Sequence, residues 1–251
     1  MKDKYKWISK PKLYKKFNNT KGEYFSNKLY VISTLIDKKE EINMKEVVLP
    51  TELVSLDGEI NGFAMPFIQN NVCASSIMLS ESSHDVKIEC LKQIGEILDK
   101  IERKGIFYPT DVHEGNFIFD NDDKMMKMVD MDSVSINGSK SFDSKYLTFN
   151  PNLWDYPHKY PMNDNDRHIA NINTMYLSYI YMVLNYISGC CYMSELSVND
   201  FYQYMKRLRS LGLDSELVDI FELIYTRGDN VSPLKCLDKI PEDIKRFSYR
   251  R

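Results

Sequence analysis

Two short apolar runs with a polar turn between them constrain this chain more than any other feature of its sequence. Residues 116–120 and 126–130 read as two short alternating strands, and residues 121–123 (Asn-Asp-Asp) are turn formers. This pattern predicts a β-hairpin. Closing the hairpin at that turn brings Asn116, which begins the first strand, beside Asp130, which ends the second.

A third polar residue, Asp111, lies five positions ahead of Asn116. Amide and carboxylate oxygens are the hard ligands that Mg²⁺ prefers, and Mg²⁺ bridges the phosphates of ATP in phosphoryl transfer. In the same chemistry a separate carboxylate orients the attacking hydroxyl and accepts its proton. We therefore expect Asn116 and Asp130 to be metal ligands and Asp111 to be a catalytic base. The alternative is an ordinary structural hairpin, because Asp and Asn are common in turns.

The pattern Asp111-x-His113-x-x-Asn116, followed by Asp130, resembles the catalytic loop and metal-binding segment of the protein-kinase-like superfamily. A His two positions after the Asp is the form common in aminoglycoside and other small-molecule kinases. The resemblance implies that His113 acts in catalysis, either by stabilising the loop or by contacting the γ-phosphate.

The sequence also departs from the common protein-kinase motifs. Residues 109–110 are Pro-Thr, so the usual His-Arg before the catalytic Asp is absent. Residues 129–134 differ from Asp-Phe-Gly and resemble the Asp-x-Asp-Ser segment of divergent bacterial protein-kinase-like domains. The second acid of that segment, Asp132, is either a helper near the metal or a turn residue, and we expect a turn residue.

The resemblance implies an α+β, two-lobed protein-kinase-like fold. A small β-rich lobe would cover residues 1–68, including the hinge, and a larger, mainly helical lobe would cover residues 69–251. Residues 48–53 and 62–67 resemble the strand pair that leads into the hinge.

The expected N-terminal lobe also carries contacts to the phosphates. Residues 11–17 read as a strand, and aligning it with the lysine-bearing strand of kinases places Lys15 at the α- and β-phosphates, with Lys16 as the reserve. The helix expected at 23–36 should supply an acid to pair with that lysine. Glu23 is the only acid early enough in this helix.

The rest of the nucleotide site follows from the same resemblance. Backbone groups of the hinge, at Met65 and Phe67, would hold the adenine. Kinases usually cover the phosphates with a Gly-rich loop, but no glycine precedes Lys15. Either the chain begins after that loop, or a shorter strand without glycine serves instead.

Apolar residues spaced three or four apart predict helices at 84–104, 166–188, 198–211 and 215–226. The first lies directly ahead of the Asp111 loop, and Gly105 is a natural C-terminal cap for it. Polar residues interrupt the second, so we expect no membrane span.

By resemblance, the expected function is an ATP- and Mg²⁺-dependent phosphotransferase acting on protein Ser/Thr hydroxyls. Two alternatives stay open. His113 speaks mildly for a small-molecule kinase of the aminoglycoside-phosphotransferase type, and the missing glycine loop suggests a nucleotide-binding pseudokinase or interaction module. An acidic pocket within residues 138–161 would favour the small-molecule substrate, whereas an open groove there would favour a protein.

Composition narrows the partners. The formal net charge of −3 implies no nucleic-acid partner, and five cysteines without a CxxC pair argue against a disulfide framework or a zinc site. The lysine-rich start lacks an apolar segment, so we expect a cytoplasmic protein with no signal peptide and no membrane association. The sequence does not indicate an oligomeric state.

Overall fold

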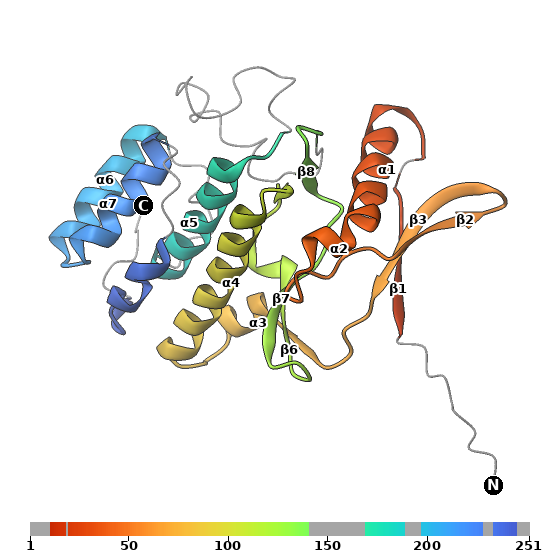
Figure 1. The fold of residues 1–251 in the computed structure, drawn as a ribbon. Coiled ribbons are helices and arrows are strands. Elements are labelled where there is room, and N and C mark those ends of the chain that lie inside the picture. The colour runs from red at the N-terminus through yellow and green to blue at the C-terminus, as the bar shows by residue number, and fades with distance from the viewer. Residues whose placement is uncertain (1–10, 19, 141–168, 189–196, 228–232, 245–251) are drawn as a thin grey trace, which may run out of the picture.

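The computed structural model describes residues 11–18, 20–140, 169–188, 197–227 and 233–244. Over these residues the chain is a mixed α and β protein with small antiparallel sheets, which confirms the expected mixture of helices and strands. Figure 1 shows the first sheet and helix α1 at one end of the molecule, α6 and α7 at the other, and α4 and α5 between them.

The elements follow one another along the chain in this order: β1 (Lys12–Lys16), α1 (Gly22–Asp37), α2 (Lys39–Ile42), β2 (Glu52–Leu56), β3 (Glu59–Pro66), β4 (Asn71–Cys73), α3 (Ala74–Leu79), α4 (His84–Lys104), β5 (Phe107–Pro109), η1 (Glu114–Asn116), β6 (Phe117–Asp120), β7 (Met125–Met128), β8 (Val134–Ile136), α5 (Ile172–Ser188), α6 (Val198–Ser210), α7 (Ser215–Arg227) and η4 (Pro233–Lys239). Here η denotes a 3₁₀-helix.

The first sheet has the strand order β1-β3-β2, and both pairings are antiparallel. Asp57 and Gly58 connect β2 to β3 with φ angles of 52° and 83°. Two successive positive φ angles make a two-residue hairpin whose twist matches that of the strands, and Asp-Gly is a favoured sequence for it. The sheet and α1 enclose a small apolar cluster of buried residues: Phe17, Ile32, Val48, Phe63 and Met65.

The strand expected at 48–53 begins later, at Glu52. The preceding residues pair with β7 instead, because the amide of Val48 donates to the carbonyl of Met128 at 2.9 Å and the amide of Met128 donates to Glu46 O at 2.7 Å. Pro50, which follows, has no amide hydrogen to contribute to a sheet. The segment 46–48 therefore joins the first sheet and α1 to the β6–β7 hairpin.

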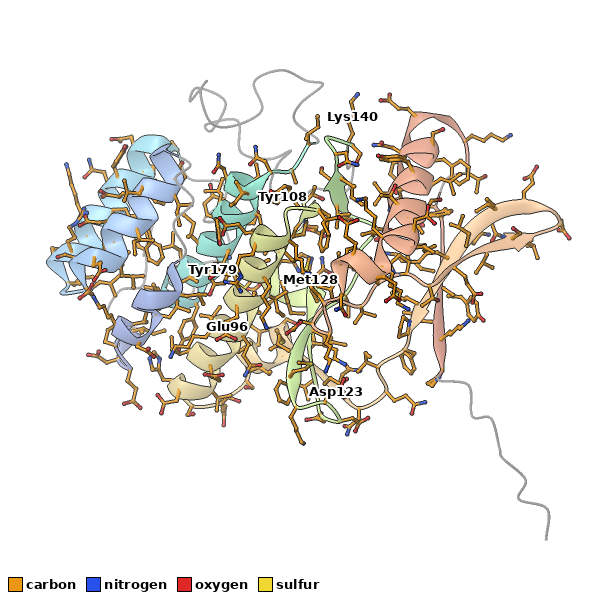
Figure 2. The ribbon with its side chains drawn as sticks, in the orientation of Figure 1. Glu96, Tyr108, Asp123, Met128, Lys140 and Tyr179 are labelled. Atoms are coloured by element: carbon orange, nitrogen blue, oxygen red, sulfur yellow. The ribbon has the colours of Figure 1, made fainter. Side chains whose placement is uncertain are left out.

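Helix α4 is the central element of the larger apolar core. It has the bounds predicted for it, and Gly105 ends it with a φ of 63°, as the sequence indicated. Gly95 lets α5 approach closely, since a Cβ there would lie 2.7 Å from Tyr179 Oη. That hydroxyl donates to Leu91 O at 2.7 Å, which fixes the ring between the two helices (Figure 2).

The helix predicted at 166–188 begins later than expected. Helix α5 starts at Ile172, and residues 166–168 lie outside the described part of the chain. Asn171 and Thr174 cap it reciprocally: Asn171 Oδ1 accepts from Thr174 N at 3.0 Å, and Thr174 Oγ1 accepts from Asn171 N at 2.9 Å. A capping box of this kind ends the non-helical chain and explains the later start.

Helices α6 and α7 lie within one residue of their predicted ends. Helix α7 packs on α5, α6 and η4. Phe201 of α6 stacks on Tyr225 of α7, with their ring centroids 3.7 Å apart. Among the helices that the structure describes, none combines the length and the apolar character needed to cross a bilayer.

The close approach at Gly95 can be tested with Gly95→Ala. The added methyl group meets a ring held by its own hydrogen bond, and overpacking costs about 1–3 kcal/mol, against about 1 kcal/mol gained from helix propensity. We expect a net loss in the free energy of unfolding, measured by urea denaturation. Glu96→Ala, at an exposed position of the same helix, is the control. Equal or higher stability of Gly95→Ala would contradict this account of the packing.

Candidate active site

The predicted hairpin forms, and it sets the frame of the candidate site. Strands β6 and β7 pair antiparallel, with Phe117 opposite Met128. The amide of Val129 donates to Asn116 O at 2.9 Å and so extends the pairing by one step. Asn116 therefore lies beside the segment that leads into Asp130, as the sequence predicted.

The far end of the hairpin is closed by a buried ion pair. Lys127 Nζ lies 2.7 Å from Asp120 Oδ2 and also contacts the Asp123 carboxylate. Asp120 Oδ1 in turn accepts from the amide of Asp122 at 2.9 Å. The hydrogen bond from Lys127 lowers the pKa of Asp120. Charge pairing at the turn thus holds the two strands in register.

The Asp111 loop folds back on the start of this hairpin. Asn116 Nδ2 donates to the Asp111 carbonyl at 2.8 Å and lies 3.3 Å from Asp111 Oδ2. On the other side of the loop, both the amide and the hydroxyl of Thr110 donate to Ser133 O at 2.9 Å. The predicted base and the predicted amide ligand are thus in contact, and the Asn116 amide oxygen is left for a cation.

His113 completes this loop. Its Nδ1 accepts from the amide of Gly115 at 3.0 Å, so Nε2 carries the hydrogen in the neutral ring. That Nε2 lies 3.3 Å from Asp111 Oδ2. Gly115 is needed for the arrangement because a Cβ there would lie 2.7 Å from His113 Cε1. The ring therefore orients the Asp111 carboxylate.

The other carboxylate oxygen of Asp111, Oδ1, is buried and has no hydrogen-bond partner among the residues that the structure describes. Buried polar atoms in folded proteins are nearly always satisfied, so an orphaned oxygen marks a place where a hydroxyl, a water or a cation would bind. This observation fits the donor set that phosphoryl transfer needs.

Asp130 and Asp132 meet two lysines from distant parts of the chain. Lys15 Nζ contacts Asp130 Oδ1 directly and lies 2.8 Å from Asp132 Oδ1. Lys28 Nζ, from α1, lies 2.7 Å from Asp132 Oδ2. Asp130 itself has a φ of 63°, an unusual conformation for a non-glycine residue that is often found at functional sites.

The two carboxylates differ in their preference for a proton. Burial, together with the hydrogen bond and negative charge of Asp132, raises the pKa of Asp130 to about 6. Burial alone would also raise the pKa of Asp132, but the hydrogen bond with Asp130 and the charges of Lys28 and Lys15 outweigh it and lower that pKa. The lysine contacts therefore favour the ionised form of Asp132, whereas Asp130 keeps a proton more readily.

Asp132 lies in a turn, as expected, but only 2 % of its side chain is accessible and two lysines contact it. One expectation about this cluster was wrong. Glu23 does not pair with Lys15; it lies in the first turn of α1 with 70 % of its side chain exposed and contacts Lys140 Nζ at 2.9 Å. Lys15 takes its acidic partners from residues 130–132 because they face it directly.

The structure also bears on the choice between Lys15 and Lys16 and on the residues expected in the hinge. Lys15, and not the exposed Lys16, reaches the carboxylates. The amide of Phe67 donates to Pro11 O at 2.9 Å, so it is already engaged in the sheet. What Phe67 offers a ligand is its ring, which is 45 % exposed. Met65 lies opposite Leu13 in the same pairing and is buried.

Sequence reasoning missed Lys28. The signal was its helical spacing: Lys28 precedes the buried residues Val31, Ile32 and Leu35 by three, four and seven positions. Residues at these spacings share one face of a helix, so a lysine among them points inward and needs a carboxylate.

Comparison with known proteins adds no relative. No family model matches this chain, and no curated protein matches its sequence. In the described part of the chain, no group of three or more His, Cys, Asp or Glu side chains is arranged to hold a metal. Mg²⁺ is commonly bound by one or two protein oxygens together with phosphates and waters.

The raised pKa of Asp130 predicts a pH-dependent cost in stability. Because the folded state binds this proton more tightly than the unfolded state, the penalty grows as the pH rises from about 4 through about 6. In metal-free buffer we expect Asp130→Asn to raise the unfolding temperature by about 2–4 °C above pH 6.5 and to have no effect below pH 4.

Asp57→Asn is the matched control, because Asp57 is exposed and also has a positive φ, of 52°. It corrects for the ease with which Asn adopts this backbone conformation. Thermal unfolding followed by circular dichroism between pH 4 and 8 measures both variants. A gain from Asp130→Asn that is independent of pH would contradict the assignment.

Proposed function

We propose that this protein is an ATP- and Mg²⁺-dependent phosphotransferase with a two-lobed protein-kinase-like fold. The single observation that carries the proposal is a pair of contacts joined by the hairpin: Asp111 contacts Asn116, Lys15 contacts Asp130 from 115 positions away in the chain, and the amide of Val129, next to Asp130, donates to Asn116 O. These are the residue types that phosphoryl transfer uses as base, metal ligands and phosphate contact.

Each side chain has a defined task in this proposal. Asp111, oriented by His113 and Asn116, accepts the proton of the attacking hydroxyl at its buried Oδ1. Asn116 and Asp130 would hold Mg²⁺ through their side-chain oxygens, and Lys15 would bind the phosphates. The ion would supply neutralisation of the charge on the phosphates. Catalysis then comes from positioning and electrostatics, with no covalent intermediate on the protein.

One feature supports the two-lobed fold: the first sheet has its own small apolar cluster, packed against α1. The larger cluster lies around α4, α5, α6 and α7 and also includes Val31 and Leu35 of α1. Leu13 on β1 (44 % exposed) and Phe67 directly after β3 (45 % exposed) offer apolar surface of the kind that an adenine ring contacts. The boundary near residue 68 stays a prediction.

For the acceptor we propose a protein Ser/Thr hydroxyl. Residues 141–161, most of the segment that would select it, lie outside the described residues, so the small-molecule alternative is decided by experiment. A second candidate is a nucleotide-binding protein without turnover. The direct contact between Lys15 and Asp130 favours it, because a lysine on a metal ligand competes with the ion.

The proposal predicts different losses from two variants. Asp111→Ala should keep Mg²⁺-dependent thermal stabilisation by ATP but lower turnover about 10²–10⁴-fold, as loss of a general base does. Asp130→Asn should abolish both turnover and the Mg²⁺ dependence. Asp57→Asn, at an exposed turn, should match the unmodified protein.

ATP hydrolysis, differential scanning fluorimetry and intact-mass detection of self-phosphorylation measure these effects. Stabilisation without any turnover would replace the phosphotransferase by the nucleotide-binding candidate. The absence of both turnover and ATP binding would overturn the proposal.

A further inference from the structure

Lys15 has two carboxylate partners in very different environments. The Asp130 side chain is 36 % exposed, whereas the Asp132 side chain is 2 % exposed. Asp132 is also held from the opposite side, because Lys28 Nζ lies 2.7 Å from its second oxygen. Asp132 is thus fixed at both oxygens, and Asp130 faces the open side of the cluster.

The two carboxylates cannot have the same role once a divalent cation binds. A cation at Asp130 competes with Lys15 for the same carboxylate, since both interact with its negative charge. A lysine that lost its only acidic partner would no longer have a fixed position. Asp132 remains in contact with Lys15 whether or not Asp130 is engaged.

We propose that Asp132 is the positioning residue for Lys15 and that Lys28 anchors Asp132 to helix α1; the functional part of this inference rests on the proposed phosphotransferase activity. In protein kinases the partner of the strand lysine is a glutamate on a helix. Here the charges are reversed: helix α1 contributes a lysine, Lys28, and the acid, Asp132, comes from the segment that follows the proposed metal ligand Asp130. The position of α1 is thereby transmitted to Lys15 through one shared carboxylate.

Burial makes this coupling specific. A buried carboxylate needs charged or hydrogen-bonding partners, and removing one partner leaves the other ion uncompensated. Asp132 joins Lys15 of β1 to Lys28 of α1, so its loss removes a buried partner from both ammonium groups and leaves Lys15 with the more exposed carboxylate of Asp130. Loss of Asp130 leaves Lys15 with the buried carboxylate of Asp132, which Lys28 also holds.

The first experiment compares how strongly Asp132 and Asp130 hold Lys15 in the nucleotide-free protein, and it does not require enzymatic activity. Lys15 acetylation by an amine-reactive reagent is followed at a single pH by peptide mass spectrometry. Asp132→Asn should raise the labelling rate of Lys15 about tenfold, since a hydrogen bond to a charged group is lost. Asp130→Asn should change it less than about twofold.

Asp120→Asn is the matched control, because Asp120 is also buried and paired with a lysine, Lys127. It should raise the labelling rate of Lys127, which keeps its contact with the exposed carboxylate of Asp123, and leave that of Lys15 unchanged. If Asp132→Asn unfolds the protein, the double variant Lys28→Met/Asp132→Asn replaces it, because that variant leaves no unpaired charge beside α1. Greater release of Lys15 by Asp130→Asn than by either of these variants would overturn the inference.

The second experiment measures Mg²⁺-ATP affinity by calorimetry. Lys28→Met should weaken binding, Lys28→Arg should restore it, and Lys28→Met should cause no further loss in the Asp132→Asn background. Additive losses would mean that Lys28 acts on the nucleotide independently and would overturn its role as anchor. If the unmodified protein binds no ATP, the proposed function fails, while the labelling result still decides whether Asp132 positions Lys15.

Discussion

The pairing of strands β6 and β7, continued by the hydrogen bond from Val129 N to Asn116 O, is the interaction on which the candidate site depends. It fixes the relative position of the two chain segments that carry the polar side chains of the candidate site. One holds Asn116 and, through it, Asp111; the other leads into Asp130. Because backbone hydrogen bonds hold the two segments side by side, their side chains would need little reorientation to contact one ligand. This limits the entropy that ligand binding would cost.

The electrostatics of the site follow from the unequal pairing of two carboxylates. Lysines contact both oxygens of Asp132 and lower its pKa despite its burial, whereas burial and the charge of Asp132 raise the pKa of Asp130 to about 6. A carboxyl that is reluctant to ionise reduces the stability of the protein, and under the proposed function a bound cation would offset this cost. The orphaned Asp111 Oδ1 is a second local cost of the same kind. Both fit the general observation that functional sites are not optimised for stability.

Local patterns were sufficient for much of the fold. The hairpin, the bounds of α4 and its glycine cap depend on neighbours within a few residues, and the sequence predicted them. The start of β2 was not predictable, because residues 46–48 prefer a distant strand, β7. The buried acidic partner of Lys15 was missed for the same reason: Lys15 and Asp132 are 117 positions apart, and no local pattern links them. Glu23 was the expected partner because it is close to Lys15 in the sequence, but in the folded chain Asp130 and Asp132 contact Lys15.

Val47 and Met128 form an isolated parallel β-bridge. It lies two residues before Asp130 and attaches the chain that follows α2 to the strand of the candidate site. The region of α1 and the chain that follows it is therefore attached to residues 128–132 at two points: through this bridge and through the ion pair of Lys28 with Asp132.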